Sequence, residues 1–148
     1  DYFIVASGGS QNQLLAMQNE EVDMLMYYDG QIHGAYQGLF NPINIKPFKA
    51  YYVFAAFSEL YRLKNAAQIS DLPSNISCAA ASEGTNFAAV ITNTGLDKKI
   101  NIEFIGTKKT AELYKLNEEY NLELCGNIET EKATELKIAE NETVLIKA

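Results

Sequence analysis

A group of polar and aromatic residues follows one short apolar segment in the first third of the chain. The segment 22–29 ends in Tyr28 and Asp29. Beyond it, the residues that could contact a ligand are Gln31, His33, Tyr36 and Phe40. Aromatic rings can cover the apolar faces of a sugar, and carboxylate or amide groups can hydrogen-bond its hydroxyls. Residue types alone favour the interpretation that the tyrosines and Phe40 are core side chains and that residues 29 and 30 form a turn, and contact with a sugar is the alternative.

Other site chemistries have less support in the residues. His33 is the single histidine and has no serine or cysteine partner that would suggest a hydrolytic triad. The chain has no Cys-x-x-Cys motif and no clustered acidic spacing, so we expect no metal site. The glycine-rich stretch 7–10 matches neither a phosphate-binding loop nor a dinucleotide fingerprint. We therefore expect no cofactor.

Composition excludes several classes of protein. The chain has 148 residues, of which 47% are hydrophobic and 21% charged, so it can bury one good core or two small ones. Its net charge of -7 would repel nucleic acid. The longest apolar runs, such as 51–57, are far shorter than the roughly 20 residues of a membrane span. The chain begins at Asp1 with neither a methionine nor a basic leader, which indicates a truncated chain, with processing as the alternative, and localisation stays open.

Two halves with different periodicities meet near residue 65. Residues 1–65 have the pattern helix (2–19), strand (22–29), loop and helix, whereas residues 66–148 consist of short alternating segments separated by turn residues. The pattern predicts an α+β chain in which a helix-strand-helix segment precedes an antiparallel β-sandwich. We expect a domain boundary between residues 65 and 66.

The helix of the first half is predicted over residues 47–63, because proline suits the first helical position. It carries two apolar stripes. The first is Ala50, Val53, Phe54, Phe57, Leu60 and Tyr61, and the second is Phe48, Tyr51, Tyr52 and Ala55. A helix that is apolar on two faces needs two covering partners. We expect the β-domain to cover one face, and either a barrel or a second copy of the chain to cover the other.

The second half predicts at least seven short strands. Segments 86–92 and 99–104, joined by the turn 93–97, predict an antiparallel hairpin with Phe87 and Phe104 in the core. The further strands are expected at 76–82, 110–116, 121–124, 135–138 and 143–147. Cys78 and Cys125 are expected on different faces of their strands, as reduced thiols.

A family resemblance is carried by the segments 22–29, 36–40 and 46–60. Together they resemble the carboxyl-terminal part of clan A glycoside hydrolases, with the family 39 β-xylosidases and family 51 α-arabinofuranosidases the most similar. In such enzymes the eighth barrel strand ends in a Tyr-Tyr or Tyr-Trp pair, and a Gly-Leu-Phe-like loop follows. A helix that begins Lys-Pro then leads into a small β-sandwich. The resemblance thus implies that residues 1–65 are the last part of a (β/α)8 barrel and residues 66–148 a β-sandwich domain.

The resemblance also implies where the chemistry lies. Retaining glycosidases hold two carboxyl groups about 5 to 5.5 Å apart, and in these families the glutamates follow barrel strands four and seven. Both would precede Asp1, so no catalytic residue is expected in this chain, and Glu20, Glu21 and Glu59 are expected to be solvated. The substrate-binding candidates are those at the carboxyl end of the eighth strand, where barrel active sites form.

The alternative hypothesis is a non-catalytic module that binds a polysaccharide or serves as structural support. Such a module would present an aromatic platform on the sandwich. Tryptophan is absent, and most of the 16 tyrosine and phenylalanine residues precede residue 65. A platform on the sandwich would therefore depend on Tyr114 and Tyr120.

Overall fold

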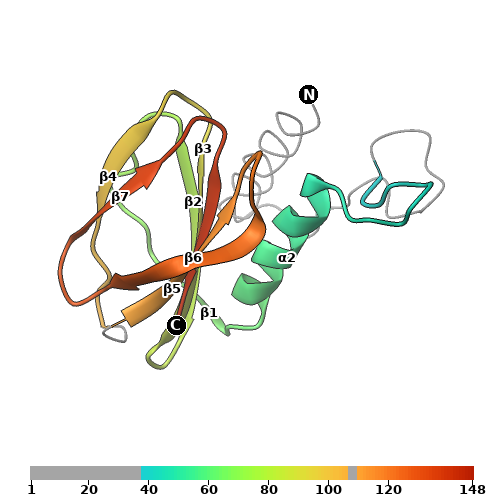
Figure 1. Ribbon diagram of the computed structural model, residues 1–148. Helices are drawn as coiled ribbons and strands as arrows, with labels where there is room; N and C mark the ends of the chain where they lie inside the picture. The colour runs from blue at the N-terminus through green and yellow to red at the C-terminus, as the bar shows by residue number, and fades with distance from the viewer. Residues whose placement is uncertain (1–37, 107–109) are drawn as a thin grey trace.

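The structure of the chain is a computed structural model that describes residues 38–106 and 110–148. One helix and eight strands follow one another in this part of the chain (Figure 1). They are α2 (Lys49–Tyr61), β1 (Asn65–Ala66), β2 (Ile76–Glu83), β3 (Asn86–Asn93), β4 (Lys98–Ile102), β5 (Thr110–Leu116), β6 (Asn121–Glu129), β7 (Thr134–Ile138) and β8 (Thr143–Lys147).

The strands form two antiparallel sheets. The larger sheet has six strands in the order β1-β2-β3-β8-β5-β6, and the smaller sheet consists of β4 and β7. Figure 1 shows α2 on one side of the larger sheet and β4 with β7 on the other. The α+β class and the antiparallel sandwich predicted from the sequence are thus confirmed.

The central strands β2, β3 and β8 are apolar along almost their whole length because both of their faces are buried. Alternate residues point to opposite faces. One face carries large side chains that pack against Ile100, Leu136 and Ile138 of the small sheet. These side chains are Ile76, Cys78, Phe87, Ile91, Val144 and Ile146. Phe87 and Phe104, both predicted to be core residues, have ring centroids 4.7 Å apart.

The opposite face of the large sheet is built mainly from small residues and is covered by α2. Val53, Ala56 and Leu60 are the buried residues of the helix. The sheet residues clustered with Ala56 and Leu60 are Ala79, Ala81, Ala88, Val90 and Leu145. Alanine at three of these five positions lets the helix backbone approach the sheet closely. The predicted contact between one helix stripe and the β-domain is therefore confirmed.

Both ends of α2 differ from the prediction of 47–63. Phe48 is the N-cap residue with extended dihedral angles (φ -83, ψ 168), and Pro47 forms a β-bridge with Phe40. This bridge keeps Pro47 extended, so the first helical position is Lys49 rather than the proline. Tyr61, predicted to lie in the buried stripe, is the last helical residue and is 91% exposed.

The predicted hairpin between 86–92 and 99–104 is wrong, because β3 and β4 belong to different sheets. β3 already has β2 on one side and β8 on the other. The side chain of Asn93 holds the turn: Nδ2 donates to Leu96 O (2.9 Å), and Oδ1 accepts from Gly95 N (3.1 Å). The chain consequently crosses to the second layer instead of returning along β3.

The other predicted strands are confirmed, and β6 extends beyond the expected 121–124 to Glu129. The predicted helix 2–19 and strand 22–29 lie outside the described residues. The domain boundary at residue 65 stays a prediction. Among the described residues, no helix combines the length and apolar character that a membrane crossing requires.

Candidate functional site

Five of the six predicted sugar-binding residues lie outside the part of the chain that the structure describes. They are Tyr28, Asp29, Gln31, His33 and Tyr36. Phe40 is the sixth, and its ring centroid lies 5.3 Å from that of Tyr51, the third residue of α2. The Tyr51 ring in turn meets Tyr52 edge to face, with centroids 5.4 Å apart. Phe40 therefore begins a row of aromatic rings at the start of α2, and its contact with a sugar stays a prediction.

A tight loop joins Phe40 to α2. Asn41 N donates to Lys46 O (2.8 Å), and Asn41 Oδ1 accepts from Ile43 N (2.9 Å). Ile45 has a φ of 58°, a left-handed conformation that is an outlier for a β-branched residue. Ile43 at the tip is 92% exposed. The loop thus holds an apolar tip in a defined and strained conformation beside the aromatic row.

A cavity of about 580 Å³ lies between α2 and strands β5, β6 and β8. Its lining includes Tyr51, Phe54 and Tyr114. The ammonium group of Lys147 lies 5.0 Å from the centroid of the Tyr114 ring and 3.1 Å from Glu59 Oε2. Tyr114 donates its hydroxyl to Glu112 (2.7 Å), which raises the pKa of Tyr114. One face of this ring is thus occupied by a lysine.

Glu59 differs from the expectation of a solvated side chain. It is 22% exposed and forms ion pairs with Arg62 (2.9 Å) and Lys147 (3.1 Å). The pair with Lys147 links α2 to β8. Glu59 therefore has a structural role at the contact between helix and sheet.

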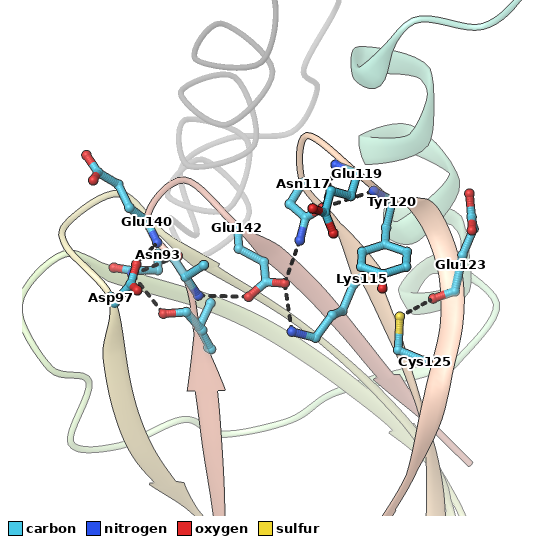
Figure 2. A network of polar contacts seen from close by, with 12 residues as sticks. Asn93, Asp97, Lys115, Asn117, Glu119, Tyr120, Glu123, Cys125, Glu140 and Glu142 are labelled. Carbon is cyan, nitrogen blue, oxygen red and sulfur yellow. Dashed lines mark hydrogen bonds and ion pairs between the residues drawn. The ribbon is translucent and has the colours of Figure 1, made fainter.

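A buried polar network joins three loops at one end of the sandwich (Figure 2). Glu142 is 0% exposed, and its two carboxylate oxygens accept three hydrogen bonds. The donors are Lys115 Nζ (2.9 Å), Asn117 Nδ2 (2.9 Å) and Ala139 N (2.8 Å). Because the carboxylate is fully satisfied, the network is a structural device rather than a catalytic group.

Asn93 and Asp97 extend this network to the turn after β3. Asn93, also 0% exposed, donates to Ala139 O (3.0 Å), and Asp97 Oδ1 accepts from Glu140 N (2.9 Å). Glu142 is not recognisable from the sequence, because a glutamate in an Asn-Glu-Thr turn has the local pattern of an exposed residue. Only the folded chain brings Lys115 and Asn117 to it.

Lys49 connects the start of α2 to the turn between β5 and β6. Its ammonium group donates to Tyr120 O (3.0 Å) and to Asn121 Oδ1 (2.5 Å). Desolvation lowers the pKa of Lys49, while the nearby Glu123 and Glu118 raise it. The helix is thus attached to the sheet by a polar contact at one end and by apolar packing along its length.

The two cysteines are confirmed as thiols in different environments. Cys78 is buried between the sheets, and Cys125 is exposed on β6. Burial raises the pKa of the Cys78 thiol to about 12, so it is a poor nucleophile. Within 38–106 and 110–148, no three histidine, cysteine or acidic residues are grouped so that they could hold a metal ion.

Comparison with known proteins finds similarity in structure but not in sequence. No protein-family model and no curated protein matches the chain. The fold is similar to that of a glycoside hydrolase family 30 subfamily 8 xylanase from Clostridium acetobutylicum, with a TM-score of 0.82 and 14% identity over 98% of this chain. It is also similar to a glucosidase from Croceicoccus marinus (TM-score 0.78, 12% identity, 99% of this chain). A family 39 β-xylosidase from Caulobacter crescentus matches 98% of the chain, with a TM-score of 0.71 and 12% identity.

The chain spans 38%, 42% and 39% of the length of these three structures, respectively. At such low sequence identity the likeness concerns the fold. The chain therefore has the fold of the carboxyl-terminal part of these larger glycoside hydrolases, as the family resemblance predicts.

Proposed function

We propose that the chain is the carboxyl-terminal part of a retaining glycoside hydrolase that acts on β-xylosides or α-arabinofuranosides. The observation that carries this proposal is the fold likeness over 98% of the chain to a xylanase of which it covers 38%. A β-xylosidase is matched to the same extent of the chain. The catalytic carboxyl groups are assigned to polypeptide outside residues 1–148.

In this proposal the described residues have a supporting role. One side of α2 is buried on the sheet through Val53, Ala56 and Leu60. The rings of Tyr51 and Phe40 lie at the start of the same helix. The helix thus connects the sandwich to the segment that contains Tyr28, Asp29, Gln31, His33, Tyr36 and Phe40, the proposed contacts with the glycoside substrate.

The alternative of a polysaccharide-binding sandwich has less support in the described side chains. Tyr114 and Tyr120, on which a platform would depend, are both half-buried. The Tyr114 ring is covered on one face by Lys147. A flat, open aromatic surface of the kind that stacks on a sugar is therefore not formed by these two residues.

The test compares the present chain with the protein encoded by the complete reading frame that contains it. Aryl β-xylosides and aryl α-arabinofuranosides are the substrates. We expect turnover by the complete protein and none by the present chain, because two carboxyl groups are needed. Turnover by the purified chain alone, or a complete reading frame that encodes no barrel, would contradict the proposal.

A further inference from the structure

The loop that precedes α2 presents apolar side chains to solvent. We call residues 41–46 the 41–46 loop. Every residue from 42 to 47 is exposed, and Ile43 and Ile45 are 92% and 58% exposed. Figure 1 shows this loop, in cyan, extending from the start of α2 and away from the sandwich. Isoleucine is among the most often buried residue types, so two exposed isoleucines on one short loop indicate a contact surface.

The conformation of the 41–46 loop is fixed by its own hydrogen bonds. Asn41 N donates to Lys46 O (2.8 Å), and Ile45 N donates to Asn41 O (2.9 Å). The side chain of Asn44 accepts from Lys46 N (3.0 Å). A ligand that binds here meets a preorganised surface, which lowers the entropic cost of binding.

Backbone strain at Ile45 also points to a ligand contact. Its φ of 58° is a conformation that favours glycine, and a β-branched side chain is strained there. Packing within the described residues does not explain the isoleucine, because its side chain is 58% exposed. Strained residues of this kind concentrate at ligand-binding sites, where the strain is part of the function. We therefore looked for polar groups beside the two isoleucines.

Amide donors accompany the apolar side chains. Asn41 and Asn44 each use Oδ1 to accept a hydrogen bond within the loop. Their Nδ2 groups have no protein partner among the described residues, so both can donate to a ligand. A sugar ring combines apolar C–H faces with hydroxyl groups. The pairing of exposed isoleucine with exposed amide donors therefore matches the chemistry of a saccharide.

We propose that the 41–46 loop binds a sugar unit of the substrate that is remote from the scissile bond. Ile43 contacts the apolar face of the ring, and Asn44 Nδ2 donates to a hydroxyl. This inference rests on the proposed function, in which the loop belongs to the connection between the eighth barrel strand and α2. Loops after barrel strands build the substrate site, and the helices form the outer ring. A loop at the start of α2 is thus at the rim of the site.

The test compares the complete protein with its Ile43→Ser variant on xylotetraose and on an aryl β-xyloside. We expect Ile43→Ser to lower kcat/KM for xylotetraose about 10-fold, because an apolar contact with the remote sugar unit is lost. The aryl β-xyloside has a single sugar unit that does not reach the rim, so its kcat/KM should change by less than about twofold. Equal losses for the two substrates, or no loss for either, would overturn the proposal.

Two further variants sharpen this comparison. Ile105→Ser is the matched control, because Ile105 is 90% exposed on the segment after β4. It should leave kcat/KM for both substrates unchanged, and a loss for xylotetraose equal to that of Ile43→Ser would overturn the proposal. Asn44→Asp keeps the acceptor for Lys46 N and removes the amide donor. It should lower kcat/KM for xylotetraose, and an unchanged value would overturn the assigned hydrogen bond.

Thermal unfolding of the complete protein excludes a contact with polypeptide. Ile43→Ser should leave the melting temperature unchanged, because a side chain that contacts only the substrate does not stabilise the free protein. A lowered melting temperature together with equal losses of kcat/KM for the two substrates would mean that Ile43 packs against the barrel. That result would overturn the proposal.

The outcomes separate this inference from the proposed function. Turnover of xylotetraose that Ile43→Ser does not affect would overturn the role of the loop and leave the glycosidase assignment intact. If the complete protein turns over no glycoside, calorimetric titration with xylotetraose gives the readout. A Kd that Ile43→Ser weakens about 10-fold would then support the loop while the proposed function fails. Absence of xylotetraose binding would overturn both.

Discussion

The carboxylate of Glu142 lies 2.9 Å from the ammonium group of Lys115, and the Glu142 side chain is 1% exposed while that of Lys115 is 26% exposed. Glu142 lies in the turn before β8, and Lys115 lies in β5. Asn117 and Ala139 donate the other hydrogen bonds to the Glu142 carboxylate. Removing one member of a buried ion pair leaves the other without compensation, which is a large penalty in a low-dielectric site. This contact therefore stabilises the end of the sandwich that carries three loops.

We expect Glu142→Gln to lower the free energy of unfolding by about 2 kcal/mol, a value reduced from a fully buried pair because Lys115 can reach water. Urea unfolding followed by circular dichroism measures it. The matched control is Glu135→Gln, because Glu135 pairs with Lys99 at 3.0 Å while 51% exposed. The control should lose less than about 0.5 kcal/mol. Equal losses of unfolding free energy in the two variants would show that burial of the Glu142 ion pair adds nothing to stability.

The two thiols should differ strongly in reactivity. Cys125 is exposed and Cys78 is buried. At pH 8 we expect one fast and one slow thiol with Ellman's reagent, at rates that differ by at least about 100-fold, because Cys78 reacts only after the sheets open. Cys125→Ser should abolish the fast phase. Two fast phases in the native chain would mean that Cys78 is accessible.

Cys78 also predicts a loss of stability at alkaline pH. Its pKa is raised by burial from 9.0 to about 12, so the folded chain holds the proton more tightly than the unfolded chain does. The contribution of the protonated Cys78 thiol to the free energy of unfolding is fully present below pH 9 and is lost as the pH rises toward 12. We expect a loss of about 1 kcal/mol by pH 10. Cys78→Ala should flatten this dependence, and an unchanged slope would assign it to other groups.

Ala79 and Ala80 are adjacent on β2 and face opposite sides of the large sheet, so enlarging each in turn tests the packing of its two faces. Ala79 is 5% exposed in the cluster with Ala56 and Leu60 of α2. Ala79→Leu should cost about 1 to 3 kcal/mol by overpacking. Ala80→Leu extends its side chain into the cavity of about 800 Å³ between the two sheets, which Ala80 lines, and should be close to neutral. Thermal unfolding of both variants distinguishes the two faces, and a larger loss for Ala80→Leu would reverse their assignment.

Backbone strain in the loop before α2 can be relieved by substitution. Ile45 has a φ of 58° and is 58% exposed, so little burial is lost when its side chain is removed. We expect Ile45→Gly to raise the free energy of unfolding by about 1 kcal/mol. Ile43→Gly, at a neighbouring position without a positive φ, should not stabilise the chain. Chemical denaturation measures both, and a loss of stability in Ile45→Gly would mean that its side chain contributes more than the strain costs.

We further propose that the present chain self-associates through the outer face of the helix region 47–63. Tyr51 and Tyr61 are 37% and 91% exposed on α2, and exposed apolar surface favours association. Sedimentation velocity should show a sedimentation coefficient that increases with protein concentration. Tyr61→Lys should reduce the association. Leu124→Lys on β6, also at an exposed apolar position (56%), is the control and should leave it unchanged.

How much the sequence determined can be judged from particular elements. The helix Lys49–Tyr61 was predictable because its apolar residues recur at helical spacing. Strands β5 and β7 were predictable from their alternation, and β8 from a short apolar run that follows turn residues. The fold of the larger enzyme family was predictable from the order of these elements and a few motifs. These features depend on neighbours within a few residues, and the sequence contains all of that information.

The partners of each strand were decided only by the tertiary structure. Strands β3 and β4 have the pattern of a hairpin, but β2 and β8 occupy both edges of β3, and Asn93 directs the chain to the second sheet. Glu142 has the local pattern of an exposed turn residue, yet Lys115 and Asn117 enclose it. Alternation specifies which face a side chain occupies, whereas pairing and burial depend on which distant segments arrive beside it. The physical reason is that these contacts join residues far apart in the chain, whose proximity no local pattern records.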